Sequence, residues 1–180
     1  MRIISGKYRG KTLKTPGNLP VRPTTNFAKE SLFNILNNLM DLEEIRAIDL
    51  FAGTGNISFE LASRGCPEVW TVEQNMKCIR FIDRTAKELD LPMKVYRSDV
   101  FRLLNKGLPK PFDLIFADPP YDHPNLEKLP ELMTDAKNLA PNGWAVLEHG
   151  PEHQFDDHPL LQNTRKYGHV RFSFFQVGKD

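Results

Sequence analysis

The sequence predicts an α/β protein with a mostly parallel β-sheet covered by helices on both faces. Two observations support this fold class. From Ile45 onward, short apolar runs rich in β-branched residues alternate with longer segments of helical periodicity. An acidic or glycine-rich turn also follows four of these runs in succession. Because ligands bind parallel sheets at the carboxyl ends of their strands, we expect a ligand site along that edge.

The expected elements follow one another in a regular order. Seven strands are predicted, at residues 45–50, 69–73, 93–97, 112–117, 144–148, 164–167 and 170–177. Helices are predicted at residues 26–41, 56–64, 75–90, 101–105 and 125–139. A turn at Gly168 separates the last two strands, which indicates a closing antiparallel pair.

Residues 1–41 precede the sheet. Residues 1–15 are expected to form a small hairpin, and residues 18–23 a connector that contains proline. Thr24 or Thr25 is expected to cap the helix that follows. Its apolar positions are expected to share one buried face: Phe27, Leu32, Ile35, Leu36 and Leu39.

The composition is that of a globular protein, with 180 residues, 40% hydrophobic and 26% charged. No apolar run approaches the roughly 20 residues needed to span a bilayer, and the first residues do not form a secretory signal. Two cysteines, Cys66 and Cys78, have no metal-type spacing, so we expect free thiols and a cytoplasmic protein. The five histidines fit no common zinc pattern and are expected at the surface or in turns, so no metal is predicted.

Charge is distributed unevenly along the chain. Residues 1–29 contain seven basic side chains and no acidic one, whereas the remaining residues contain 17 basic and 23 acidic side chains. Tyr8 and Phe27 are interleaved with the positive charges. A basic arm on an acidic body favours a polyanionic partner, and the aromatic residues favour nucleic acid.

The first two polar features at strand ends suit a nucleoside. In the segment Asp49–Asn56, glycines after a strand let the backbone approach a ligand, and the following helix offers free N–H groups. Glu73 ends the next strand, where an acid can accept hydrogen bonds from both ribose hydroxyls.

The other two features suit a base and an amine. Asp99 can accept a hydrogen bond from an adenine amino group while its apolar neighbours hold the ring. In Asp118-Pro119-Pro120-Tyr121, two prolines stiffen the backbone, so the turn can present fixed acceptors to a planar amino group beside an aromatic ring. A dinucleotide and S-adenosyl-L-methionine both fit the nucleoside features, but Ser58 stands where the dinucleotide pattern has a third Gly or Ala.

Together, the segment 49–55, Glu73, Asp99 and the turn 118–121 resemble the Rossmann-like S-adenosylmethionine-dependent amino-methyltransferases. Three N-terminal segments, residues 2–10, 22–25 and 29–34, are similar to the bacterial 16S rRNA (guanine-N2)-methyltransferase family. The similarity covers nearly the whole chain. One departure is Asn26, because the family usually has Asp after the paired threonines.

The resemblance implies a class I methyltransferase fold with a seven-stranded sheet, in which residues 1–41 form a basic RNA-binding extension and residues 42–180 the catalytic domain of a single compact unit. It implies transfer of a methyl group from S-adenosyl-L-methionine, which becomes S-adenosyl-L-homocysteine, to the N2 amine of a guanine in 16S rRNA. The implied partner is this RNA within an assembling or assembled small ribosomal subunit. Apart from the resemblance, a monomer is the default expectation, and the composition predicts no membrane partner.

Candidate site residues fall into three groups. The catalytic group is Asp118, Pro119, Pro120 and Tyr121. The cofactor-binding group is Asp49, Phe51, Gly53, Gly55, Asn56, Glu73, Gln74, Asp99, Val100 and Asp118. The RNA-binding group is Arg2, Lys7, Arg9, Lys11, Arg22, Thr24, Thr25 and Lys29. Three alternatives remain: methylation of adenine N6 in DNA or RNA, a nicotinamide-dependent oxidoreductase, and a non-catalytic RNA-binding module.

Overall fold

The computed structural model describes residues 1–17 and 25–178. The expected connector at 18–23, and the candidate RNA-binding residues Arg22 and Thr24, lie outside the described residues. The chain divides into two compact units, Met1–Ser98 and Asp99–Asp180, and each is described by itself.

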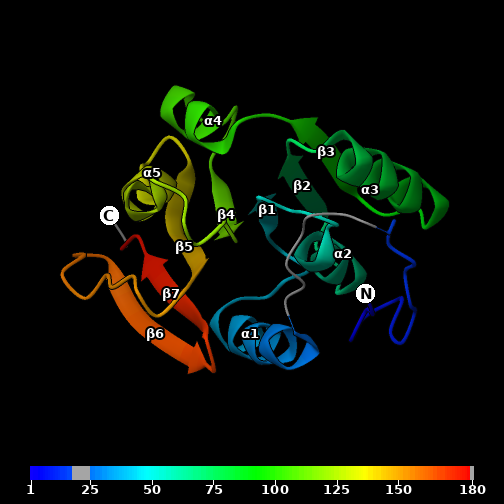
Figure 1. Cartoon of the computed structure of the whole chain (residues 1–180), viewed down its shortest axis with the longest axis horizontal. Coiled ribbons are helices and arrows are strands. Elements are labelled where there is room, and N and C mark those ends of the chain that lie inside the picture. The colour runs from blue at the N-terminus through cyan, green and yellow to red at the C-terminus, as the bar shows by residue number, and fades with distance from the viewer. Residues whose placement is uncertain (18–24, 179–180) are drawn as a thin grey trace. The chain divides into compact units, whose positions relative to one another are not determined.

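The described residues of the first unit form three parallel strands and three helices (Figure 1). In chain order these are α1 (Asn26–Leu39), β1 (Arg46–Leu50), α2 (Asn56–Ser63), β2 (Glu68–Glu73), α3 (Met76–Glu88) and β3 (Met93–Arg97). The strands lie in the order β3-β2-β1, and both pairs are parallel. Helix α3 buries residues at helical spacing, namely Cys78, Phe81, Ile82, Thr85 and Ala86, which explains why it packs along one face.

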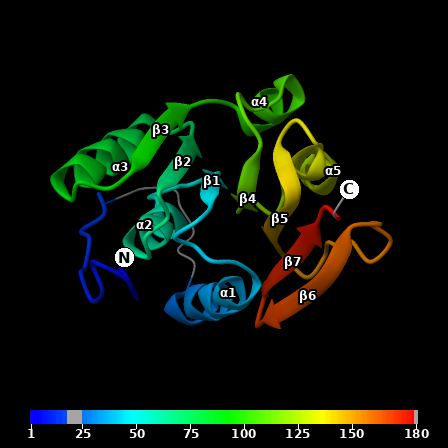
Figure 2. The ribbon, with the colours of Figure 1, turned by 180° about the vertical axis from the view of Figure 1, so that it is seen from behind.

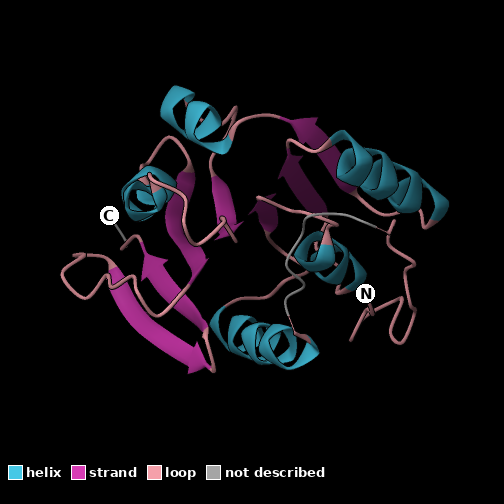
Figure 3. Cartoon of the chain, in the orientation of Figure 1, coloured by secondary structure: helices cyan, strands magenta, loops and turns pink. Residues whose placement is uncertain are grey.

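The second unit forms four strands within residues 99–178 (Figure 2). Its elements are α4 (Val100–Lys106), β4 (Phe112–Ala117), η1 (Leu126–Lys128), α5 (Leu129–Thr134), β5 (Leu139–His149), β6 (Leu161–Tyr167) and β7 (Val170–Gln176). Strands β4 and β5 pair in parallel, and β7 pairs antiparallel with both β5 and β6. The described residues therefore contain the seven expected strands and the closing antiparallel pair (Figure 3).

Several element predictions are corrected, including the sixth strand, which begins at Leu161 and not at residue 164. The face predicted for the first helix was wrong in part, because Phe27 is 69% and Leu39 38% exposed, whereas Lys29 and Phe33 are buried. The helix predicted at 125–139 is the short pair η1 and α5. It ends at Thr134 because Asn138, fully buried, holds the following chain through hydrogen bonds from its side-chain nitrogen to the Leu104 and Leu132 carbonyls.

Strand β5 is longer than predicted, because it begins at Leu139 and not at Trp144. The pairing partner on β5 moves from Leu139, opposite Phe112, to Trp144, opposite Leu114, so the intervening residues form a bulge. Asn142 lies in this bulge at a φ of 61°. A proline and a glycine beside it break the alternation of a strand pattern, which is why the sequence did not indicate this first part.

The N-terminal segment, residues 1–13, is hairpin-like but contains no regular strand. One antiparallel bridge joins Arg2 to Thr12, and the Ile3 N–H donates to the Lys11 carbonyl at 2.9 Å. Ile3 and Leu13 are buried in the same hydrophobic cluster as Phe59, Phe81 and Ile82. The segment is therefore packed on the first unit and is not a loose arm.

Main-chain groups attach this segment to α2. The Ile4 and Ser5 N–H groups donate to the Glu60 carboxylate at 2.8 and 3.0 Å, and the Lys7 N–H donates to the Ser63 carbonyl at 2.7 Å. At Gly6, with a φ of 79°, an added Cβ would lie 1.8 Å from the Ser63 carbonyl oxygen. Only glycine fits this position.

Among the described residues, no helix has the length and apolar character to cross a membrane.

Candidate functional site

The glycine-rich loop between β1 and α2 contains three residues in the left-handed backbone region. They are Phe51 at a φ of 60°, Gly53 at 55° and Gly55 at 80°. A Cβ on Gly55 would lie 3.1 Å from side-chain atoms of both Phe59 and Ile82, so this position is closely packed. Phe51 is an outlier for a bulky residue, and such strain is concentrated at ligand sites. Strain and close packing thus coincide in the predicted cofactor loop.

Glu73 organises this loop from the end of β2. Its Oε2 accepts a hydrogen bond from the Gly53 N–H at 2.7 Å, and its Oε1 accepts from the N–H groups of Gln74 and Asn75 at 2.7 and 2.8 Å. A carboxylate offers about four acceptor sites on its two oxygens. These three bonds leave room for one further donor, such as a ribose hydroxyl.

Asp49 does not lie at the surface of the loop. Its side chain is 1% exposed, and its Oδ2 accepts hydrogen bonds from the backbone N–H and the hydroxyl of Ser58, at 3.0 and 2.5 Å. Thr71 in turn donates to the Ser58 hydroxyl at 3.0 Å. Burial raises the pKa of the Asp49 carboxyl to about 7. Asp49 therefore supports the first turn of α2 from below, and a contact of its own with a cofactor stays a prediction.

Lys29 requires a correction, because it was predicted to bind RNA. Its side chain is 1% exposed, and its Nζ lies 3.3 Å from Glu60 Oε2. The same nitrogen donates to the Arg2 carbonyl at 2.7 Å and to the Asn56 Oδ1 at 2.8 Å. Burial lowers the pKa of the Lys29 ammonium, and the Glu60 carboxylate opposes this effect. The side chain is committed to the interior and cannot reach a phosphate.

Asn56, a predicted cofactor residue, is thereby tied to this buried cluster through its side-chain oxygen. Glu60 also accepts from Arg64 Nε at 2.8 Å. The cluster joins α1, the N-terminal segment and the first residue of α2. It holds the helix whose N-terminus follows the glycine-rich loop.

The predicted adenine contacts lie at the start of the second unit. Asp99 is exposed and caps α4, because its Oδ1 accepts from the Arg102 N–H at 2.8 Å. Val100 is only 2% exposed, so its side chain belongs to the core. A role of either residue at the base of a cofactor stays a prediction.

The turn Asp118–Tyr121 follows β4 as predicted. Asp118 is half-buried, Pro119 is buried and Pro120 is exposed. Tyr121 is held at both ends: its hydroxyl donates to Glu148 Oε1 at 2.9 Å, and its carbonyl oxygen lies 2.8 Å from His153 Nε2. The His123 N–H closes the turn on the Pro120 carbonyl at 2.9 Å.

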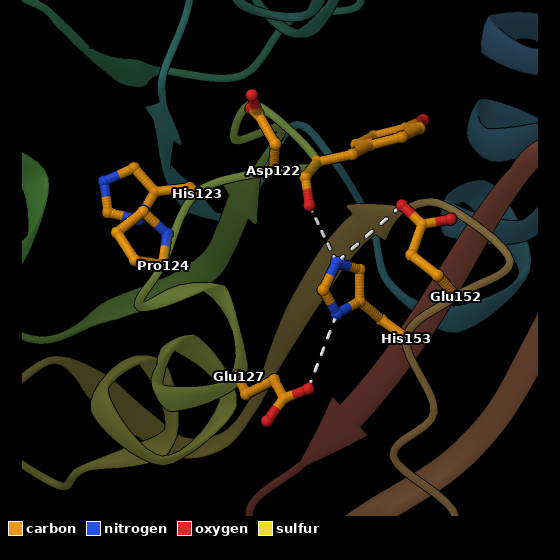
Figure 4. Close-up of a pocket in the computed structure, with 7 residues that line it drawn as sticks. Asp122, His123, Pro124, Glu127, Glu152 and His153 are labelled. Atoms are coloured by element: carbon orange, nitrogen blue, oxygen red, sulfur yellow. Dashed lines mark hydrogen bonds and ion pairs between the residues drawn. The ribbon is translucent and has the colours of Figure 1, made fainter.

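A pocket of about 620 Å³ adjoins this turn. The residues that line it are Tyr121, Asp122, His123, Pro124, Glu127, Glu152 and His153. Figure 4 shows His153 between Glu127 and Glu152, and its ring nitrogens lie 3.7 and 3.8 Å from their respective carboxylates. The ring of His123, one of the lining residues, stacks on the ring of Phe101 with 4.7 Å between their centroids.

The remaining predicted RNA-binding side chains in the described residues are those of Arg2, Lys7, Arg9, Lys11 and Thr25. The four basic side chains are exposed on the N-terminal segment. Thr25 is the N-cap of α1, and its hydroxyl accepts from the Ala28 N–H at 3.2 Å. The four exposed cations therefore lie on one packed segment. Thr25 instead stabilises the N-terminus of α1 as its cap.

His149 contradicts the expectation that the histidines lie at the surface or in turns. It is 1% exposed at the end of β5, where its Nδ1 donates to the Gly150 carbonyl and its Nε2 accepts from the Ser173 hydroxyl at 2.8 Å. Burial lowers the pKa of its imidazole. Across residues 1–17 and 25–178, no group of three or more His, Cys, Asp or Glu side chains could hold a metal ion.

Sequence reasoning missed three residues that shape these sites: Glu60, Glu148 and His153. Glu148 carries the same signal that identified Glu73, since it is an acid at the end of a predicted strand. Glu60 and His153 carry none, because one lies mid-helix and the other in a segment without a recognisable pattern.

Comparison with known proteins identifies the family. The model of the family "Conserved hypothetical protein 95" matches residues 1–176. The chain is 36% identical to "Putative rRNA methyltransferase YlbH" of Bacillus subtilis, with 84% of each chain covered. It is 31% identical to "Ribosomal RNA small subunit methyltransferase D" of Buchnera aphidicola from Acyrthosiphon pisum, covering 81% of this chain and 76% of that protein.

The fold agrees with this result. The solved structure of "Putative methyltransferase yhhF" from Escherichia coli matches with a TM-score of 0.84 and 28% identity, covering 100% of this chain and 99% of that one. This likeness confirms the predicted Rossmann-like methyltransferase fold, with seven strands that are mostly parallel. The chain therefore belongs to the Conserved hypothetical protein 95 family, which includes methyltransferases of small-subunit ribosomal RNA, as its sequence resemblance predicted.

Proposed function

We propose that this protein transfers a methyl group from S-adenosyl-L-methionine to the exocyclic N2 amine of a guanine in 16S rRNA. The observation that carries the proposal is the turn 118–121: an acid and two prolines at the end of β4, followed by a tyrosine held at both its hydroxyl and its carbonyl. Membership in a family that includes small-subunit rRNA methyltransferases supports the reaction class and the RNA.

The first unit holds the methyl donor in this proposal. The Gly53 and Gly55 backbone allows close approach, and Glu73 has one acceptor site left for a ribose hydroxyl. Asp49 and Lys29 act indirectly, because they fix the start of α2 beneath the loop. When bound, the donor supplies an electrophilic methyl group on a positively charged sulfur.

The second unit holds the amine. The lone pair of a guanine N2 is delocalised into the ring, so the amine is a weak nucleophile. Acceptance of its two N–H groups by the Asp118 carboxylate and the Pro119 carbonyl draws the nitrogen toward a tetrahedral geometry and frees the lone pair. Asp118 also stabilises the positive charge that develops on the nitrogen during transfer. The proton then leaves to water.

Tyr121 provides the surface on which the extruded base stacks, because the target amine cannot react while the base is stacked in a helix. Most of the acceleration comes from positioning, and the stiffness of the two prolines serves it. The packed N-terminal segment presents Arg2, Lys7, Arg9 and Lys11 to RNA phosphates, which orients the substrate without reading its sequence.

The test is methyl transfer to small ribosomal subunits purified from cells that lack this protein. Incubation with donor carrying a labelled methyl group, followed by nuclease mapping, should give one N2-methylguanine in 16S rRNA. Naked 16S rRNA and subunits from cells that contain the protein are the matched comparison substrates. Label on an adenine amine, or no label on either form of the RNA, would refute the proposed target.

A further inference from the structure

We propose that Glu148 and His153 are positioning residues of the reaction, which together fix Tyr121 as the plate on which the target base stacks. The inference rests on the proposed function and deepens it. It is drawn from two contacts of Tyr121 within the second unit, one with a residue near the end of β5 and one with a residue in the loop that follows.

The hydroxyl end of Tyr121 is fixed by a buried acceptor. Glu148 is 3% exposed near the end of β5, and its Oε1 accepts the tyrosine hydroxyl at 2.9 Å. A carboxylate acceptor makes a stronger hydrogen bond than a neutral one. Because this oxygen belongs to a strand in the middle of the second unit's sheet, it restrains the ring against rotation and tilt.

The backbone end of Tyr121 is fixed by His153. The Tyr121 carbonyl can only accept, so His153 Nε2 must carry the proton in this 2.8 Å hydrogen bond. The His153 side chain is 15% exposed, and its Nδ1 faces Glu127 Oε1 at 3.7 Å. This hydrogen bond holds the peptide group at the C-terminal end of the Asp118–Tyr121 turn.

The loop that carries His153 is itself anchored. His149 donates to the Gly150 carbonyl and accepts from Ser173 on β7, so the chain leaves β5 in a defined direction. Tyr121 is thus held at two points, by Glu148 on β5 and by His153 in the anchored loop that follows this strand. A ring held in this way needs no reorganisation when a base arrives, which is what preorganised catalysis requires.

The hydroxyl contact can be tested by a double-mutant cycle. Tyr121→Phe keeps the ring but loses the donor, and Glu148→Gln keeps an acceptor whereas Glu148→Ala does not. We expect Tyr121→Phe and Glu148→Ala each to lower kcat by about tenfold, and the double variant to be no worse than either single one. Glu148→Gln should retain most of the activity. Independent, multiplying losses would show that the two residues do not act through each other.

The carbonyl contact is tested by His153→Ala and His153→Gln, with His169→Gln at an exposed turn as the matched control. We expect kcat to fall by about tenfold in His153→Ala, to recover in His153→Gln, which again has an N–H donor, and to stay unchanged in the control. The KM for S-adenosyl-L-methionine and the Tm should stay close to wild type in both His153 variants. This combination separates positioning from a merely structural role.

Two further results would overturn the inference. One is a wild-type kcat in both His153→Ala and Glu148→Ala. The other is a fall in Tm that parallels the loss of activity in His153→Ala and is not restored by His153→Gln. A wild-type protein that methylates no guanine in the small subunit refutes the proposed function instead, so the two failures are distinguishable.

Discussion

Lys29 Nζ lies 3.3 Å from Glu60 Oε2, and both side chains are inaccessible to solvent. Glu60 also accepts the Ile4 and Ser5 N–H groups and pairs with Arg64, so a single carboxylate joins α1, α2 and the N-terminal segment. Lys29, although it belongs to the basic stretch of the sequence, thus pairs with a carboxylate of the same protein. The consequences for stability and for RNA binding are separable by experiment.

Replacement of Lys29 by Met should lower the free energy of unfolding by about 3 kcal/mol, because it leaves Glu60 buried without its ammonium partner. Lys14→Met, at an exposed position of the same stretch, should change it by less than about 0.5 kcal/mol. Denaturant titration measures both. A Lys29→Met protein of normal stability that binds RNA poorly would restore the original RNA-binding assignment.

Neutralisation of the exposed cations should weaken RNA binding in a salt-dependent way. With Lys7, Arg9 and Lys11 replaced by Gln, the slope of log K against log[salt] for small subunits should decrease in magnitude by about 2. A matched triple variant on α3, with Lys77, Arg84 and Lys87 replaced by Gln, should keep the wild-type slope. Equal slopes for all three proteins would remove the N-terminal segment from the interface.

Asp118→Ala should retain binding of the methyl donor and lose about 10²–10³-fold in kcat, because one preorganised charge is lost from the transition state. Asp118→Asn, which keeps the shape, separates charge from packing. Asp122→Asn, at an exposed neighbouring carboxylate, serves as the control. Calorimetric binding of the donor and single-turnover methyl transfer are the two measurements, and normal turnover in Asp118→Ala would exclude this residue from the chemistry.

The buried Asp49 makes stability depend on pH. Its pKa is raised from 3.8 in the unfolded chain to about 7 in the folded protein, so the folded state binds more protons between these values. The contribution is fully present below about pH 4 and is lost as the pH rises through 7. The difference in unfolding free energy between wild type and Asp49→Asn should therefore fall with rising pH, by at most about 1.4 kcal/mol per unit. A difference that is constant from pH 4 to 7 would contradict the raised pKa.

The sequence was informative where local chemistry and tertiary environment agree. Strands β3 and β4 begin and end as predicted, because each is a short apolar run bounded by turn residues, a pattern that favours a strand in a buried sheet. The Gly53 loop, Glu73 and the turn at Asp118 lie at the ends of β1, β2 and β4 as predicted, whereas their roles in binding or catalysis stay predictions. The bulge before Trp144 and the early end of α5 depend on partners that are distant in the chain, such as Phe112 and Leu104.

The same limit applies to side chains. Lys29 and Arg9 are both cations in one basic stretch, yet one is buried and the other exposed. The difference arises from Glu60, which lies 31 residues beyond Lys29 on another helix, and no local pattern reports it. His153 likewise becomes meaningful only through a carbonyl 32 residues earlier.

The N-terminal segment is attached to α2 through its peptide groups and through a glycine that has no room for a methyl group. The side chains of Lys7, Arg9 and Lys11 are exposed and take no part in that attachment. The backbone of the segment therefore provides the attachment, and these exposed side chains can be replaced independently of it. Replacement of these three side chains would change the charge that the segment presents to solvent, while leaving its attachment to α2 undisturbed.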